Sequence, residues 1–228
     1  MPRTARLWVD GLAYHVLNRG NRRQQIFSRP ADYESCLTTM ADGLEKVPIR
    51  LLSFTLMPNH FHMVFWPNQA CEISAYMRWF MNAHIRRHHR FHELWGTGHL
   101  YQGRYKAFPI QTGVHLLTVL RYVEANAYRA ALVARAEAWP WSSLSRHAAA
   151  DRRYLLSTGP ITRPANWLSM VNEPLPQPVR DALRNSAQRQ VGFGDPAWIR
   201  SLGCREETPV VDVRAGAPTG TLNRDTQG

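Results

Sequence analysis

The chain alternates between stretches with an apolar residue at every second position and stretches with apolar residues at every third or fourth position. The first spacing is typical of a strand with one buried face, and the second is typical of an amphipathic helix. Cys36, Leu37, Met40 and Leu44 have the helical spacing, and Asp32 precedes them as the expected helix cap. The predicted elements, in chain order, are a strand over 14–18, a helix over 33–46, strands over 49–57 and 60–66, a helix over 72–91, a strand over 101–111 and a helix over 115–135.

This order of elements predicts the fold class. A two-residue break, Pro58-Asn59, separates the second and third strands and favours a hairpin. The order strand, helix, two strands, helix, strand is typical of a ferredoxin-like α+β fold. We therefore predict an antiparallel sheet with helices on one face, followed by an additional helix over 115–135.

The sequence changes character after residue 150. Five prolines punctuate the next segment: Pro160, Pro164, Pro174, Pro176 and Pro178. Two short helices are predicted beyond them, over 179–190 and 196–202. From residue 205 the chain has little apolar content and no periodicity, which predicts disorder. The predicted division is a main domain over 1–150, a Pro-rich linker and short helical accessory region over 151–204, and a tail over 205–228.

Positive charge is the strongest feature of the composition. The 228 residues carry a formal net charge of +11, and the sequence pI is about 10.3. Residues 1–150 contain 18 lysines and arginines against 9 acidic residues, and they contain all ten histidines. This balance favours a polyanionic partner, most often a nucleic acid, although a high charge also serves solubility alone. We expect the chemistry to lie in residues 1–150.

The lengths of the apolar runs and the spacing of the cysteines indicate the cellular compartment. No run approaches the roughly 18 apolar residues that span a bilayer, and the first residues lack the pattern of a secretory signal. Cys36, Cys71 and Cys204 are far apart and form no Cys-x-x-Cys pair, which argues against a disulfide framework or a thiolate zinc site. These features predict a soluble, cytoplasmic protein that associates with the nucleoid and not with a membrane.

Two histidines lie two positions apart in the predicted strand 60–66. Because side chains alternate along a strand, Phe61, Met63 and Phe65 can enter the core while His60 and His62 project together from the opposite face. Two neutral imidazoles at that spacing can share one divalent cation if a third ligand comes from elsewhere. Two surface histidines without a metal would give the same pattern.

A tyrosine and an asparagine lie one turn apart in the predicted helix 115–135. The packing stripe of that helix is formed by Leu116, Leu120, Val123, Ala127 and Ala131. Tyr122, Asn126 and Arg129 fall on the opposite side. A phenol beside an amide suits a site in which the phenol attacks a phosphate and the amide completes a metal site. An ordinary tyrosine that packs against another element would have the same spacing.

Five motifs occur in order along the chain: Asn-Arg-Gly-Asn-Arg-Arg at 18–23, Met-Pro-Asn-His-Phe-His at 57–62, Gly-His-Leu-Tyr-Gln-Gly-Arg-Tyr-Lys at 98–106, Arg-Tyr-Val-Glu-Ala-Asn at 121–126 and Trp-Pro-Trp-Ser-Ser at 139–143. Together, over about residues 8–147, they resemble the REP-associated tyrosine transposases. That family belongs to the single-tyrosine HUH endonucleases and the insertion-sequence-200-like transposases. The ordered series is far more specific than any one motif.

The resemblance implies a catalytic domain that cleaves single-stranded DNA near a hairpin, forms a 5′-phosphotyrosine and releases a 3′-hydroxyl. It also implies that Tyr122 is the nucleophile and that His60, His62 and Asn126 bind magnesium or manganese. Relatives usually have proline after the asparagine, where this chain has Ala127. Alanine favours continuation of the helix, so the local geometry can differ from that of the family.

Cationic side chains near aromatic residues extend the predicted DNA-binding surface, because cations track phosphates while rings stack on bases. This combination suits single-stranded or hairpin DNA. The predicted DNA-binding residues are Arg22, Arg23, Arg78, Arg86, Arg87, Arg104 and Lys106. His84, His88, His89 and His92 lie among several arginines, and we expect no carboxylate or cysteine partner that would complete a second metal site with them.

Two other functions stay open at the level of sequence. One is a protein of the same fold that binds DNA hairpins without catalysis. The other is a metal-dependent hydrolase that uses the histidine pair and water. The sequence does not decide between a monomer and a homodimer.

Overall fold

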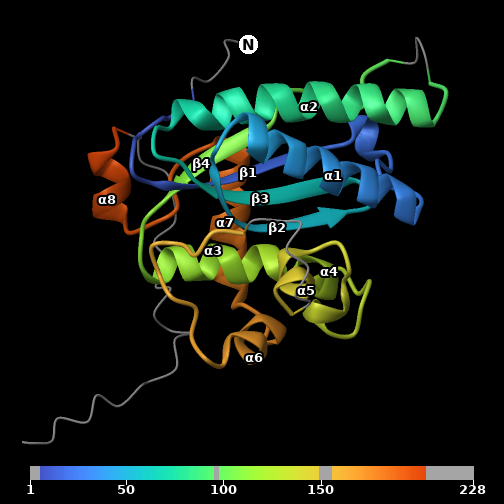
Figure 1. Ribbon diagram of the computed structural model, residues 1–228. Helices are drawn as coiled ribbons and strands as arrows, with labels where there is room; N and C mark the ends of the chain where they lie inside the picture. The colour runs from blue at the N-terminus through green and yellow to red at the C-terminus, as the bar shows by residue number, and fades with distance from the viewer. Residues whose placement is uncertain (1–5, 95–97, 149–155, 204–228) are drawn as a thin grey trace, which may run out of the picture.

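The protein, described here by a computed structural model over residues 6–94, 98–148 and 156–203, is built on one four-stranded sheet. The strands are β1 (Ala13–Arg19), β2 (Arg50–Met57), β3 (His60–Trp66) and β4 (Lys106–Ile110), in the order β2-β3-β1-β4 (Figure 1). All neighbouring strands are antiparallel. Met57 pairs with His60 across the Pro58-Asn59 turn, which confirms the predicted hairpin.

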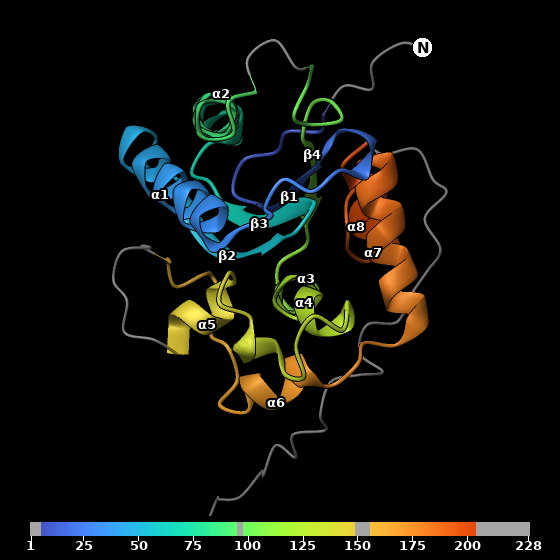
Figure 2. The ribbon, with the colours of Figure 1, turned by 90° about the vertical axis from the view of Figure 1, so that its right-hand side faces the viewer.

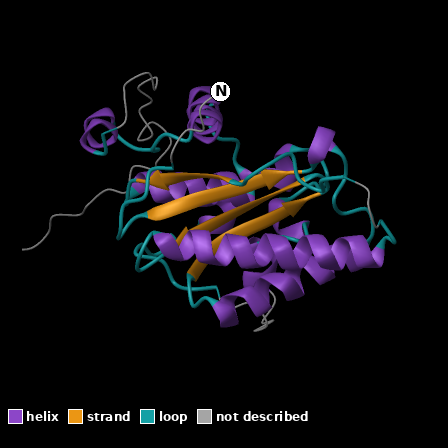
Figure 3. Ribbon diagram, turned by 90° about the horizontal axis from the view of Figure 1, so that it is seen from above, coloured by secondary structure: helices purple, strands orange, loops and turns teal. Residues whose placement is uncertain are grey.

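Helices cover both faces of the sheet. The long helices α1 (Pro30–Lys46) and α2 (Cys71–Phe91) lie on one face, and α3 (Val114–Glu124) with α4 (Asn126–Arg129) lies on the other (Figures 1 and 2). The predicted α+β fold is therefore confirmed, and the additional helix after the last strand covers the second face. Figure 3 shows the molecule from above, with the strands side by side and helices around them.

Six further helices complete the described part of the chain. They are η1 (Asn21–Arg23), η2 (Ala136–Ala138), α5 (Ser143–Ala148), α6 (Trp167–Asn172), α7 (Gln177–Arg189) and α8 (Pro196–Ser201). Helices α7 and α8 correspond to the two predicted short helices. α7 packs beside β4 and α6 packs against α3, so both stand close to the second face (Figure 2). The predicted tail, 205–228, lies outside the described residues. Within the described ranges, every helix is too short or too polar to cross a lipid bilayer.

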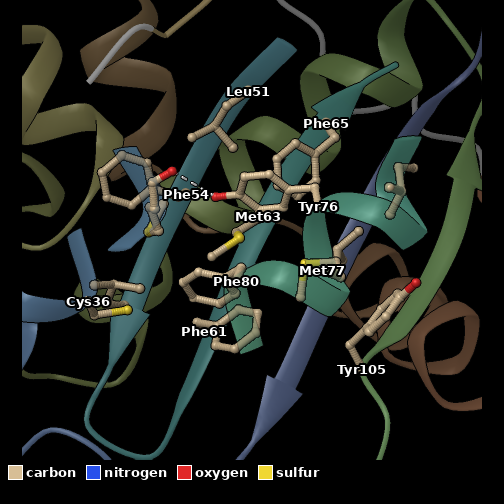
Figure 4. Close-up of a cluster of buried hydrophobic side chains, with 14 of the residues drawn as sticks. Cys36, Leu51, Phe54, Phe61, Met63, Phe65, Tyr76, Met77, Phe80 and Tyr105 are labelled. Atoms are coloured by element: carbon tan, nitrogen blue, oxygen red, sulfur yellow. Dashed lines mark hydrogen bonds between the residues drawn. The ribbon is translucent and has the colours of Figure 1, made fainter. Parts of the chain in front are cut away.

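Successive side chains of β3 point to opposite faces of the sheet, and each face has its own hydrophobic core. Phe61, Met63 and Phe65 point toward α1 and α2 and pack with Tyr76 and Phe80 of α2 (Figure 4). The opposite face of the sheet contributes to a second core with α3, α6 and α7. Polar side chains on that second face are therefore enclosed by helices.

Two predicted elements begin at other residues. Helix α1 begins at Pro30, whose fixed φ suits a first helical position, so Asp32 lies in the first turn and not at the cap. Its carboxylate accepts backbone N–H groups of Ser28 and Arg29 at 2.9 and 3.0 Å. Strand β4 is shorter than predicted. Before Lys106, Gln102 N–H donates to the Arg19 carbonyl at the end of β1, and the Gly103 carbonyl accepts from the Asn18 side chain, so the regular strand pairing begins only at Lys106.

The predicted helix 115–135 is broken. α3 ends at Glu124, and α4 ends at Arg129. The Asn126 side-chain amide donates to the Val123 carbonyl at 3.3 Å, a bond that competes with the helical ladder. Ala131 then adopts a left-handed backbone (φ 54°) and is exposed, so its predicted place in the packing stripe is wrong.

Candidate functional site

A pocket of about 700 Å³ lies on the second face of the sheet, between β1, β3, the α3–α4 segment and α7. All four residues that the resemblance assigns to catalysis and metal binding line it. Its complete lining is His15, Leu17, Asn18, Arg19, His60, His62, Gln102, Gly103, Arg104, Lys106, Tyr122, Asn126, Arg129, Arg184, Ala187 and Gln188.

The β3 strand places the two histidines of the predicted pair side by side. Their ring centroids are 5.0 Å apart, and the rings are nearly perpendicular. The Nδ1 atom of His60 lies 2.6 Å from Oδ1 of Asn59. An amide oxygen only accepts, so His60 Nδ1 donates this bond and its Nε2 keeps a lone pair. The strand alternation therefore predicted the arrangement correctly.

A third histidine, His15 of β1, was not predicted. Its Nε2 lies 2.8 Å from Nδ1 of His62, and their rings stack with centroids 4.9 Å apart. The alternation of β1 places His15 on the face opposite Tyr14 and Val16, but the partner depends on the register between β1 and β3, which pairs His62 with Leu17. A single sequence does not contain that register.

Burial keeps these imidazoles neutral near pH 7. Desolvation lowers the pKa of His15 from 6.5 to about 3 and that of His60 to about 4. The pKa of His62 falls well below its usual value, first through burial and then through neighbouring His15, His60 and Arg129. Neutral imidazoles can act as metal ligands without first losing a proton.

The phenol of Tyr122 enters the same pocket. Its ring centroid lies 6.3 Å from that of His15 and 6.2 Å from that of His62. Arg129 stacks over the ring at 4.0 Å and donates from Nη2 to Oδ1 of Asn126 at 2.6 Å. One guanidinium thereby contacts both the predicted nucleophile and the predicted amide ligand. The expectation that Tyr122, Asn126 and Arg129 share a side holds despite the break in the helix.

A buried carboxylate anchors the helix that carries Tyr122. Glu124 is fully buried and accepts from Trp167 Nε1 at 2.7 Å and from Arg163 Nη2 at 3.0 Å. It also accepts from Ser53 and Ser143, each at 3.1 Å. This network ties the end of α3 to β2, α5 and α6. It gives Ser143 of the 139–143 motif a structural role next to the site.

The cations at the pocket come from several elements. Arg104 and Lys106, both predicted to bind DNA, line it together with Arg19, Arg129 and Arg184, and no described lining residue is acidic. Arg184 belongs to α7. It was not predicted as a site residue, because the helical pattern does not indicate where α7 packs. Arg184 pairs with Asp181 at 3.1 Å, but Asp181 does not line the pocket. A pocket lined by five cations and no described acidic residue favours a polyanion.

The other predicted DNA-binding residues lie outside the pocket. Arg22 and Arg23 are exposed in η1, and the Asn59 amide next to His60 holds the Arg23 carbonyl at 3.2 Å. Arg78, Arg86 and Arg87 lie on α2, on the opposite face of the sheet from α3 (Figure 1). Arg87 pairs with Asp42 at 2.6 Å. Their role in DNA binding stays a prediction.

The side chains fit a cation bound by two imidazoles and one amide. No group of three or more His, Cys, Asp or Glu in the described ranges could hold a metal. The predicted third ligand is instead Asn126, and its Oδ1 already accepts from Arg129. An all-neutral set gives modest affinity, so hard cations would bind chiefly together with a phosphate oxygen.

Comparisons with known proteins identify the family and the fold. The model of the family "Transposase IS200 like" matches residues 8–126. A solved structure described as a REP-associated tyrosine transposase bound to a REP hairpin is similar in fold, with a TM-score of 0.55, 17% sequence identity, and coverage of 78% of this chain and 100% of that one. A putative transposase from Deinococcus radiodurans R1 matches with a TM-score of 0.39 and 19% identity over 54% of this chain and 96% of that one. A search of curated proteins returned no significant match.

The family match spans more than half of the chain and contains His60, His62, Tyr122 and Asn126. The chain belongs to the IS200-like transposases.

Proposed function

We propose that the protein is a metal-dependent endonuclease and strand transferase that acts on single-stranded DNA near hairpins, through a 5′-phosphotyrosine at Tyr122, and so carries out DNA transposition. The observation that carries this proposal is the convergence of four residues from three elements, β3, α3 and α4, on one pocket: His60, His62, Tyr122 and Asn126. Membership of the transposase family supports the same reading.

In the covalent step, a phosphodiester bond of the DNA is exchanged for a bond to the tyrosine. The Tyr122 oxygen attacks the phosphorus and forms a phosphotyrosine bond, while the bond from phosphorus to the 3′-oxygen breaks. The phenol loses its proton, and the departing strand leaves as a 3′-hydroxyl. Attack by a 3′-hydroxyl on the phosphotyrosine reverses the exchange, which rejoins or transfers the strand. The bond energy is conserved, so no nucleotide cofactor is required.

Arg129 has two tasks in this scheme. Its guanidinium over the Tyr122 ring holds the phenol in place and places positive charge where phenolate develops. Its hydrogen bond to Asn126 Oδ1 orients the amide toward the pocket. Both contacts come from one side chain, which couples the position of the nucleophile to that of the ligand.

His60, His62 and Asn126 would hold a magnesium or manganese ion. When bound, such an ion would neutralise charge on the non-bridging oxygens of the scissile phosphate. The two imidazoles are already neutral through burial, so the site is available to a cation at neutral pH. Arg19, Arg104, Lys106 and Arg184 would contact the flanking phosphates.

A hairpin substrate is supported by the similar solved structure, which is described as bound to a REP hairpin. Arg22 and Arg23 stand beside the His60 end of the pocket and would contact DNA next to the cleaved strand. Arg78, Arg86 and Arg87 would contact DNA that continues around the sheet to α2.

A labelled single-stranded oligonucleotide that contains a REP-like hairpin separates the three possible functions. We expect a protein–DNA adduct that survives boiling in denaturant, requires Mg²⁺ or Mn²⁺ and disappears with a chelator. Binding without cleavage would favour the hairpin-binding protein. Cleavage without an adduct would favour the metal-dependent hydrolase, and either result would contradict the proposal.

A further inference from the structure

His15 is a buried polar residue in direct contact with a predicted metal ligand. Its side chain is 1% exposed, and its Nε2 atom lies 2.8 Å from His62 Nδ1. Both rings are held in this arrangement, since β1 and β3 are hydrogen-bonded neighbours and the rings stack. The contact therefore fixes Nδ1 as the nitrogen of His62 that faces His15 on β1.

The hydrogen bond also decides where the His62 proton lies. One of the two facing nitrogens carries the hydrogen and the other accepts. If His62 donates from Nδ1, its Nε2 keeps a lone pair. If His15 donates instead, His62 carries its own proton on Nε2, and that nitrogen cannot bind a cation.

His60, two residues before His62 on β3, shows how a hydrogen bond fixes which ring nitrogen carries the proton. Asn59 Oδ1 can only accept, so it holds the His60 proton on Nδ1 and leaves Nε2 as the ligand atom. Metal-binding histidines commonly donate their other N–H to such a partner, which fixes the ring and its tautomer. Among the described residues, the hydrogen-bond partner of the His62 ring is His15.

We propose that His15 is a positioning residue that accepts the hydrogen bond from His62 Nδ1–H and so presents His62 Nε2 to the catalytic cation. The inference rests on the proposed function, because it takes His62 to be a metal ligand. It assigns a role to a residue outside the motifs that indicated the site.

The surroundings of His15 make this role sensitive to substitution. In the proposed arrangement His15 carries its own proton on Nδ1, which is buried and has no hydrogen-bond partner within the described structure. That side of the strand packs against Phe108, whose ring centroid lies 5.0 Å away. Nδ1 of His15 has no partner among the described residues in either tautomeric arrangement, so a cation bound at His62 Nε2 selects the arrangement in which His62 donates.

The test measures Mn²⁺ affinity in the full chain saturated with the hairpin oligonucleotide, by titration followed with electron paramagnetic resonance, and subtracts the Mn²⁺ bound by the oligonucleotide alone, because the neutral ligand set binds hard cations chiefly together with a phosphate oxygen. The variant His15→Gln keeps an acceptor near the position of Nε2, whereas His15→Leu has a similar size and no acceptor. We expect His15→Gln to bind Mn²⁺ within about threefold of the parent and His15→Leu to bind about 10- to 100-fold more weakly. Equal affinity of the parent and His15→Leu would overturn the inference.

A second measurement on the parent protein is independent of folding defects in the variants. Nitrogen-15 correlation spectra of the Mg²⁺-loaded protein should show His62 protonated at Nδ1 and His15 accepting at Nε2. A proton on His62 Nε2 would overturn the inference.

Failure of the inference and failure of the proposed function give different results. If the parent binds Mn²⁺ and forms the DNA adduct while His15→Leu does the same at equal metal concentration, only the role of His15 is refuted. If the parent binds no Mn²⁺, the proposed metal site fails and the inference is overturned with it.

Discussion

At the residue scale, strand and helix periodicity predicted which side chains of the site share a face. His60 and His62 followed from the alternation of β3, and Tyr122 with Asn126 followed from the helical spacing. His15 did not, because its contact with His62 depends on the pairing of two strands that are distant in sequence. Local periodicity gives the face of a residue, and only the register between strands gives its neighbour.

The two tyrosines of the α3–α4 segment provide a matched pair for the nucleophile. Tyr122→Phe should abolish the covalent adduct and leave DNA affinity within about twofold, because the variant loses the attacking oxygen and keeps the ring. Tyr128→Phe removes a hydroxyl six residues later and should still form the adduct. Denaturing gels and binding titrations with the same labelled oligonucleotide measure both. An adduct formed by Tyr122→Phe would show that another group is the nucleophile.

At the element scale, the order of strands and helices was predictable, whereas the ends of elements depended on tertiary contacts. The break after Glu124 is an example, since alanines at 125, 127, 130 and 131 favour a continuous helix. The buried bonds of Glu124 and the side-chain bond of Asn126 override that preference. The local sequence pattern also could not predict that α7 lies at the pocket, because that position depends on the packing of α7 against β4.

The Glu124 network should therefore control both stability and the placement of the nucleophile. Glu124→Ala leaves Arg163 and the Trp167 N–H without their acceptor, and we expect a loss of about 3–5 kcal/mol in the free energy of unfolding. Asp42→Ala is the control, because its pair with Arg87 lies at the surface and should contribute less than about 1 kcal/mol. Urea unfolding measures both. Equal stability of the two variants would refute the anchoring role of Glu124.

At the scale of the whole molecule, buried neutral histidines link stability to pH. Burial lowers the pKa of His84 from 6.5 to about 3, and its Nδ1 lies 2.6 Å from the Tyr101 hydroxyl. Between these values the unfolded chain binds a proton that the folded protein excludes, so this contribution is present above pH 6.5 and is lost as the pH falls toward 3. Each such histidine contributes a slope of at most about 1.4 kcal/mol per pH unit.

His84→Asn keeps a polar group near the position of Nδ1 and removes the titration. Its free energy of unfolding should fall less steeply between pH 6.5 and 5 than that of the parent. Chemical unfolding at a series of pH values measures the difference. Parallel curves for the two proteins would contradict the burial of a neutral His84.

The distribution of cations predicts how DNA binding responds to salt. Each phosphate contact to single-stranded DNA contributes a log-log slope of about −0.7. Arg104→Ala with Arg184→Ala, both at the pocket, should make the slope shallower by about 1.4 by that rule. Arg78→Ala with Arg86→Ala removes the same charge from α2, across the sheet, and should change the slope less. A larger effect of the α2 pair would place the main DNA path on that face.

The central claim is that Tyr122 becomes covalently attached to the 5′-phosphate of cleaved DNA. Tandem mass spectrometry of the trypsin- and nuclease-digested adduct tests it most directly, because trypsin cuts after Arg121 and Arg129 and releases residues 122–129 as one peptide. That peptide contains both Tyr122 and Tyr128, so its fragments distinguish them. We predict a nucleotide phosphate on Tyr122. Attachment to Tyr128 or to another residue, or cleaved DNA without any attached peptide, would contradict the account.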